Sequence, residues 1–90
     1  MVQVKFEEHA SAQARINYYT NGMVALQSYN TIVVEVNEGW VKVNGLYSAT
    51  TRKHIGWFAK MLNLTYQDLK SFYEDNMIYN IYTGEYKDAQ

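Results

Sequence analysis

The chain has 90 residues, of which 48% are hydrophobic, 16% aromatic and 19% charged, and its formal net charge at pH 7 is −1. This length and composition predict one small folded domain over residues 1–90 and exclude a disordered chain. No apolar run approaches the ~20 residues of a bilayer-spanning helix, and the net charge lacks the positive field on which non-specific nucleic-acid affinity depends.

The first residues alternate apolar and polar side chains, with Val2, Val4 and Phe6 on one face. This pattern favours a short strand and differs from the basic and apolar regions of a secretory signal. The chain has no cysteine, which excludes disulfides and thiolate chemistry and suits a reducing compartment. We therefore expect a cytoplasmic protein.

A first β-hairpin is predicted between Ala14 and Tyr29. Its strands, Ile16–Tyr19 and Met23–Gln27, are joined by a turn that contains the pair Asn21-Gly22. Asparagine and glycine tolerate the positive φ angles of a type I′ turn, so this pair favours a tight hairpin.

A second hairpin pairs Thr31–Asn37 with Trp40–Gly45 across a Glu38-Gly39 turn. This register places valines opposite one another on one face and an ion pair on the other, and a one-residue slip would undo both arrangements. The expected pairs are Val36 with Val41, Val34 with Val43, and Glu35 with Lys42. The same register puts Trp40 on the outward face together with Val33, Glu35 and Lys42. With Ser28–Asn30 as the middle turn, the two hairpins form a four-stranded meander.

Two amphipathic helices follow the meander. The first begins near the hydroxyl residues 48–51 and buries Ile55, Phe58, Ala59 and Leu62, which recur at helical spacing. Asn63 can take the left-handed conformation that ends a helix. The second helix begins at Thr65, with Asp68 three residues later as in a capping box, and runs to about Asp75 while burying Leu69 and Phe72.

Residues Met77–Tyr82 return to a β-like alternation before Thr83-Gly84, which predicts a short last strand. The expected fold class is therefore α+β. It consists of an antiparallel β-meander of about four strands, followed by two packed α-helices and a short C-terminal strand.

Residues capable of chemistry are present but are not grouped in a catalytic or metal-binding pattern. His9 and His54 lie far apart without metal-ligand spacing, and both are expected to be partly exposed structural histidines. No serine lies in a nucleophile elbow, and the neighbouring Glu74 and Asp75 would point about 100° apart on a helix. We therefore predict no enzyme activity, no metal site and no cofactor.

The outward face of the first helix is the strongest candidate for a binding surface. Lys53, Gly56, Trp57 and Lys60 fall opposite its apolar stripe, and Arg52 and Met61 flank them. Such a basic and aromatic patch suits an acidic partner surface, a stacked base or self-association. The alternative is that Trp57 folds under a loop or the N-terminal segment and the lysines are merely solvated. A glycine inside a helix also suggests close packing at Gly56 or close approach of a partner backbone.

Two stretches resemble a family of small uncharacterised proteins of bacteriophages and prophages, chiefly from Gram-positive hosts. These are Ser28–Val34, with the pattern S-Y-x-T-[IV], and Gly45–Ile55, with the pattern Y-S-x-T-T-x-K-H. The likeness covers roughly residues 23 to 62. It implies a mobile-element origin and a life in the bacterial cytoplasm, and it brings no established activity, ligand or catalytic residue.

These observations favour a non-enzymatic phage or prophage accessory protein that binds a host or phage protein and modulates a host process. The partner-binding candidates are Trp57, Lys53, Lys60, Arg52 and Trp40. The alternative is weak single-stranded nucleic-acid binding by the same patch, with Trp40 or sheet tyrosines adding stacking. Homo-oligomerisation stays open, because a small meander has edge strands to protect.

Overall fold

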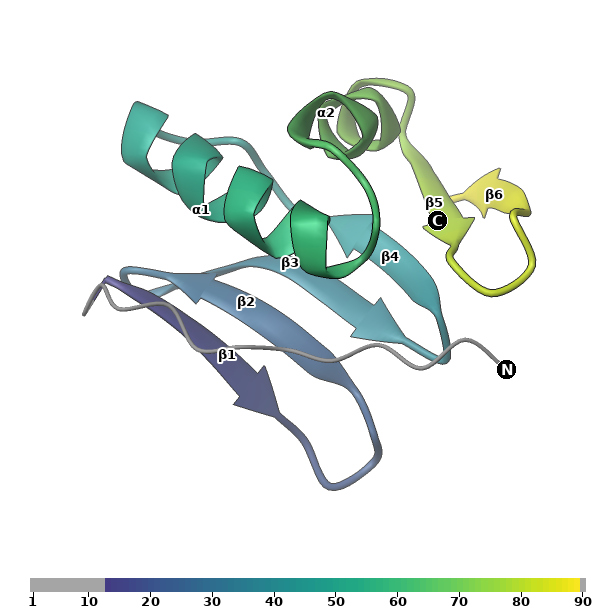
Figure 1. Ribbon diagram of the computed structural model, residues 1–90, viewed down its shortest axis with the longest axis horizontal. Coiled ribbons are helices and arrows are strands. Elements are labelled where there is room, and N and C mark those ends of the chain that lie inside the picture. Colours follow the sequence, from purple (N-terminus) through teal and green to yellow (C-terminus); the bar gives the residue numbers. More distant parts are fainter. Residues whose placement is uncertain (1–12, 90) are drawn as a thin grey trace.

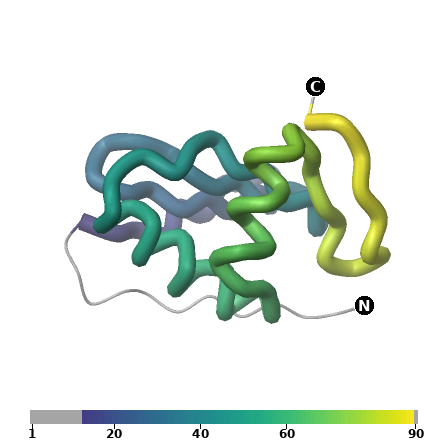
Figure 2. The backbone as a smooth tube through the Cα atoms, turned by 90° about the horizontal axis from the view of Figure 1, so that it is seen from above, coloured from purple at the N-terminus to yellow at the C-terminus, as the bar shows by residue number. Residues whose placement is uncertain are grey.

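A computed structural model describes residues 13–89 and contains a six-stranded antiparallel sheet with two helices against one of its faces (Figure 1). The strands lie in the sheet in chain order, and both helices are inserted between the fourth and fifth strands. The helices form one layer and the sheet another, as Figure 2 shows from above. In chain order the elements are β1 (Ala14–Tyr18), β2 (Val24–Ser28), β3 (Thr31–Asn37), β4 (Trp40–Val43), α1 (Ala49–Met61), α2 (Tyr66–Glu74), β5 (Met77–Asn80) and β6 (Tyr86–Asp88).

The expected α+β class is confirmed, but the expected number of strands is too low. The meander of four strands continues through β5, which pairs with β4, to β6, which pairs with β5. The strand expected at residues 2–6 and the histidine at position 9 lie outside the described residues.

The β3–β4 hairpin has the predicted register. Val36 is opposite Val41, and Glu35 is opposite Lys42. Glu38 and Gly39 form the turn with φ angles of 53° and 85°, as a type I′ turn requires.

The β1–β2 connection differs from the predicted two-residue turn. Tyr18 pairs with Val24, so five residues connect the strands. Only Gly22 in this loop has a left-handed φ, at 88°, and its N–H donates to the carbonyl of Tyr19. The Asn21 side chain accepts a hydrogen bond from the N–H of Met23 at 3.0 Å. Asparagine therefore stabilises the loop through its side chain rather than through positive φ.

Val33 was expected on the outward face of the sheet, and this expectation is wrong. The register of β2 and β3 shifts by one residue, because Leu26 pairs with Val34 while Gln27 pairs with Ile32. This bulge offsets the alternation of side chains along β3. Val33 is completely buried and belongs to the core, as its neighbour Val34 does.

The turn between the helices is fixed at both of its ends. Asn63 has a φ of 59°, and the N–H of Leu64 reaches back to the carbonyl of Ala59, which closes α1 as in a Schellman motif. Thr65 and Asp68 form the predicted capping box, with hydrogen bonds of 2.9 and 3.1 Å between each side chain and the other residue's N–H. The direction of α2 relative to α1 is thereby set within a few residues.

The core lies between the helices and the sheet face that they cover. The helices place Ile55, Phe58 and Ala59 of α1 and Leu69 and Phe72 of α2 in it, as predicted. The sheet and the β4–α1 connection contribute Ile16, Leu26, Val33, Val34, Val36, Val41, Val43 and Leu46.

Aromatic packing holds the C-terminal hairpin against α2. The rings of Phe72 and Tyr79 stack at a centroid distance of 5.2 Å, and Tyr86 lies against both rings at 5.8 and 4.9 Å. Such pairs contribute stability beyond the area that they bury. Only three residues form β6, and all three are exposed, so alternation alone could not predict this strand.

Asn80 joins the end of β5 to the β3–β4 turn. Its amide donates to the carbonyl of Glu38 at 3.3 Å, while its side-chain oxygen accepts from the N–H groups of Tyr82 and Thr83. The Tyr82 ring lies directly over Gly39, where an added Cβ would come within 2.5 Å of it. A glycine is therefore required here both by its φ and by the ring.

This arrangement predicts a difference between two glycine substitutions. Gly22 and Gly39 have similar φ angles, but none of the described residues around Gly22 comes within 4 Å of a Cβ added there. Gly22→Ala should lower the free energy of unfolding by about 1–2 kcal/mol through backbone strain alone. Gly39→Ala should cost about 1–3 kcal/mol more, because Tyr82 and Asn80 must move. Urea unfolding of both variants measures the difference, and equal losses would contradict this packing.

Candidate functional site

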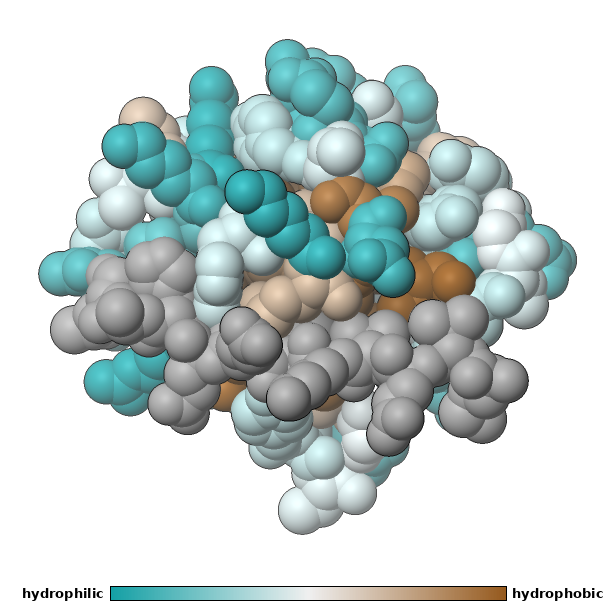
Figure 3. Space-filling model, in the orientation of Figure 1, coloured by the Kyte–Doolittle hydropathy of each residue, from teal (hydrophilic) through white to brown (hydrophobic). Residues whose placement is uncertain are grey.

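The outer face of α1 and the turn into α2 form a hollow of about 390 Å³. Three of the predicted binding residues, Lys53, Trp57 and Lys60, line it together. The remaining described residues of its lining are Gly56, Leu64, Thr65 and Tyr66. In Figure 3, hydrophobic surface emerges between hydrophilic side chains in the region where α1 and α2 meet.

The helical period explains why these side chains share a face. The buried stripe of α1 faces the sheet, so Lys53 and Lys60 are left on the opposite side, exposed and two turns apart. Two turns correspond to about 10 Å along the helix axis. The basic groups thus stand at two ends of the hollow.

Trp57 is half-buried, so it lies between the two alternatives considered from the sequence, an exposed binding residue and a residue buried under another segment. Its ring packs against the edge of the core, as do Leu64 and Tyr66, while it still lines the hollow. A large aromatic side chain that is partly buried is held in place and still presents surface to a ligand. Of the residues expected to flank it, Arg52 is exposed and Met61 packs on the core, and the described lining includes neither.

Trp40 lies on the other side of the sheet. Its neighbour Val41 points into the core, so Trp40 faces outward, where the ammonium of Lys87 stands 4.2 Å from the centre of its ring. A separate hollow of about 380 Å³ includes Trp40, Lys87, Glu35 and Lys42. The structure therefore does not bring Trp40 together with Trp57.

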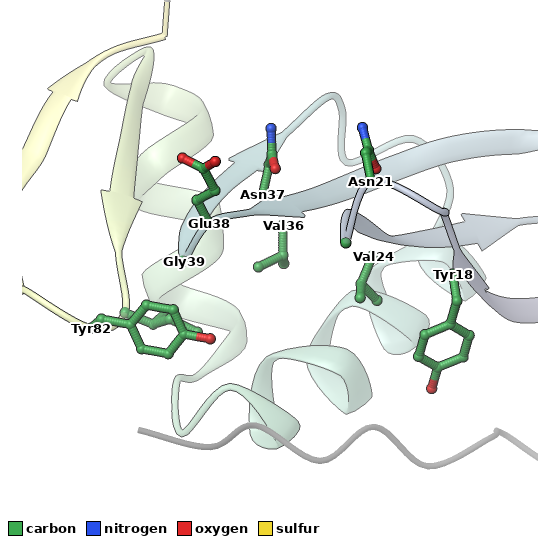
Figure 4. A pocket seen from close by; sticks show the side chains of 10 residues that line it. Tyr18, Asn21, Val24, Val36, Asn37, Glu38, Gly39 and Tyr82 are labelled. Carbon is green, nitrogen blue, oxygen red and sulfur yellow. The ribbon is translucent and has the colours of Figure 1, made fainter. Parts of the chain in front are cut away.

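A third hollow, of about 390 Å³, opens where the β1–β2 and β3–β4 turns meet the loop after β5. Figure 4 shows Tyr18, Val24, Val36 and Tyr82 extending to the same side of the sheet, while Glu38 points the other way. Both tyrosines are well exposed, at 59% and 43%. Because segments that are distant in the sequence line this hollow, no local sequence pattern predicted it.

A buried hydrogen-bond network joins the end of β2 to the first turns of α1. The Ser28 hydroxyl lies 2.9 Å from Thr51 Oγ1 and 2.9 Å from His54 Nδ1. All three residues are at most 3% exposed, so the expectation that His54 is partly exposed is wrong. Thr51 and His54 precede Ile55 and Phe58 by one helical turn each, so they extend the buried stripe of α1. That spacing is the signal that could have placed the histidine inside.

A serine paired with a histidine is the beginning of a nucleophile–base arrangement, but this pair is closed to substrate. Ser28 and His54 are 2% and 3% exposed, and the Ser28 hydroxyl is shared with Thr51. Every buried polar side-chain atom of the described residues has a hydrogen-bond partner. The network therefore serves as a structural link between β2 and α1, in which the hydrogen-bonding groups have partners.

Residues 4–75 match the model of a family described as a family of unknown function (DUF8033). The chain belongs to this family. Neither a curated protein nor a solved structure matches it.

The DUF8033 match covers the lining of the α1–α2 hollow and the Ser28–His54 network, whereas β5 and β6 lie beyond it. Among residues 13–89 there is no group of three or more His, Cys, Asp or Glu side chains that could hold a metal ion. Within the same residues neither helix is long and apolar enough to cross a membrane.

The space around Gly56 differs from what the sequence suggested. Among residues 13–89, a Cβ added there would meet only the Cβ of Tyr66, at an ordinary 3.6 Å, so packing within this part of the chain does not require the glycine. Gly56→Ala should therefore raise the free energy of unfolding by about 0.5–1 kcal/mol, because alanine favours the helix. Thermal and urea unfolding measure this gain, and a loss of stability would show that the turn into α2 is tighter than described.

Removal of one hydroxyl tests the buried network. Ser28→Ala should lower the free energy of unfolding by about 1–3 kcal/mol, because His54 and Thr51 would each lose a partner away from water. Ser71→Ala is the matched control, since Ser71 is exposed on α2. If the two variants lose equally little stability in urea, the network does not join the sheet to α1.

Proposed function

We propose that this member of the DUF8033 family is a non-enzymatic protein-binding module that contacts its partner through the α1–α2 hollow. One observation carries the proposal: a half-buried tryptophan and two exposed lysines of α1 line one hollow together. Partly buried aromatic side chains surrounded by charged groups are typical of the energetic centre of protein interfaces.

The chemistry of the hollow supports binding rather than catalysis. Its described lining has lysines, a threonine and aromatic residues, whereas proton transfer needs an acid and a base that converge on a reacting atom. The only serine–histidine pair within hydrogen-bond distance among residues 13–89 is buried. We therefore assign the protein no reaction and no cofactor.

A phage or prophage origin and a place in the bacterial cytoplasm belong to the same proposal. They rest on the S-Y-x-T-[IV] and Y-S-x-T-T-x-K-H patterns, which lie at the β2–β3 turn and at the start of α1. In this setting the partner is a host or phage protein, and the binding event modulates a host process.

The test is an affinity pull-down from a lysate of a Gram-positive host, with and without nuclease. Wild type should retain a partner protein both with and without nuclease. The double variant Lys53→Glu/Lys60→Glu should not retain it. Both lysines are exposed, so this double variant should fold, and the carboxylate at position 60, in the last turn of α1, should lower the free energy of unfolding by no more than about 1 kcal/mol. Trp57→Ala should lose the same protein, after circular dichroism has shown that the variant folds.

Arg15→Glu is the matched control for charge. Arg15 is exposed on β1, where its neighbours Ala14 and Ile16 point into the core and it points away from the helices. This variant should retain the partner as wild type does. Recovery that disappears with nuclease would favour the nucleic-acid alternative, and recovery equal in all variants would place the interface elsewhere on the molecule.

A further inference from the structure

The α1–α2 hollow combines an apolar floor with a basic rim. Trp57, Leu64 and Tyr66 each pack partly against the core, so the floor is anchored by the folded interior and does not depend on the ligand for its shape. Lys53 and Lys60 are exposed above it. A volume of about 390 Å³ has room for a bulky apolar side chain together with part of its backbone.

The charges around the floor have one sign. The described lining contains two lysines and no carboxylate. Asp68, in the first turn of α2, is not part of this lining, and its carboxylate accepts the N–H of Thr65 at 2.9 Å. The charged side chains of the described lining are therefore both basic, and a segment of opposite charge complements them.

Resting on the binding role proposed above, we infer that the occupant is an acidic peptide segment of the partner, with one large apolar side chain between carboxylates. The apolar side chain sits on Trp57 and Tyr66, and the carboxylates reach Lys53 on one side and Lys60 on the other. The lysines are about 10 Å apart along the helix axis. An extended segment rises about 3.3 Å per residue, so the two carboxylates are about three residues apart and flank the anchor.

The two lysines of the rim are compatible with a flexible acidic segment. A lysine ammonium is a point charge on a flexible stem, so it can meet a carboxylate without the fixed two-point geometry of a guanidinium. The aromatic floor supplies most of the contact area, and the rim selects the charge of the segment.

The experiment selects ligands from a random twelve-residue display library on the full-length protein and then measures the binding of the enriched peptides to wild type and to Lys53→Glu/Lys60→Glu. The proposal predicts enriched sequences with Asp or Glu on both sides of one Leu, Phe, Trp or Met. For a synthetic peptide of that sequence, the double variant should bind at least about tenfold more weakly, whereas Arg15→Glu should change the affinity less than about twofold. Replacement of the flanking Glu by Gln in the peptide should reproduce the loss.

Each other result overturns the proposal. Enriched peptides that are neutral or basic, peptides that bind the double variant equally well, or a library without retained binders would exclude an acidic segment as the occupant. If the lysate partner is nevertheless lost in the lysine double variant, the binding role of α1 stands and only the ligand class is wrong. If neither ligand nor partner depends on the lysines, both proposals fail.

Discussion

The structure depends on the burial of one face of α1 against the sheet. Phe58 and Ile55 are completely buried between the sheet and α2, and their position fixes the rotation of the whole helix. Because side chains follow one another by about 100°, that rotation turns Lys53, Trp57 and Lys60 outward together. The Asn63 turn and the Thr65 capping box then bring Leu64 and Tyr66 to the same place. The hollow is thus a consequence of core packing and helix termination.

The network of Ser28, Thr51 and His54 holds the other end of α1. These residues belong to the stretches Ser28–Val34 and Gly45–Ile55, which are separated in the chain but meet in the fold. The S-Y-x-T and Y-S-x-T-T-x-K-H patterns therefore have a structural reason here, because they join β2 to α1. The hollow extends along the outer face of α1 to the turn into α2, and of its described lining only Lys53 is part of these patterns.

The sequence was sufficient where a pattern repeats locally. Alternating valines predicted the β3–β4 register, and helical spacing with Asn63 and Thr65 predicted both helices and their caps. It failed where distant residues decide the outcome. The bulge that buries Val33 depends on pairing with β2, and β6 depends on rings from α2 and β5. The grouping of Lys53, Trp57 and Lys60 was predictable, whereas the contribution of Tyr66 required the angle between the helices.

The most direct test of the hollow as the contact surface uses the two tryptophans as internal reporters. Their indole N–H signals are resolved from the backbone in a ¹H–¹⁵N correlation spectrum, and the protein has only these two, on opposite sides of the sheet. On addition of the bound partner or selected peptide, the Trp57 signal should shift together with backbone signals of α1 and the α1–α2 turn, while the Trp40 signal stays in place. A shift at Trp40 with Trp57 unchanged would contradict the account and place the interface on the outer face of the sheet.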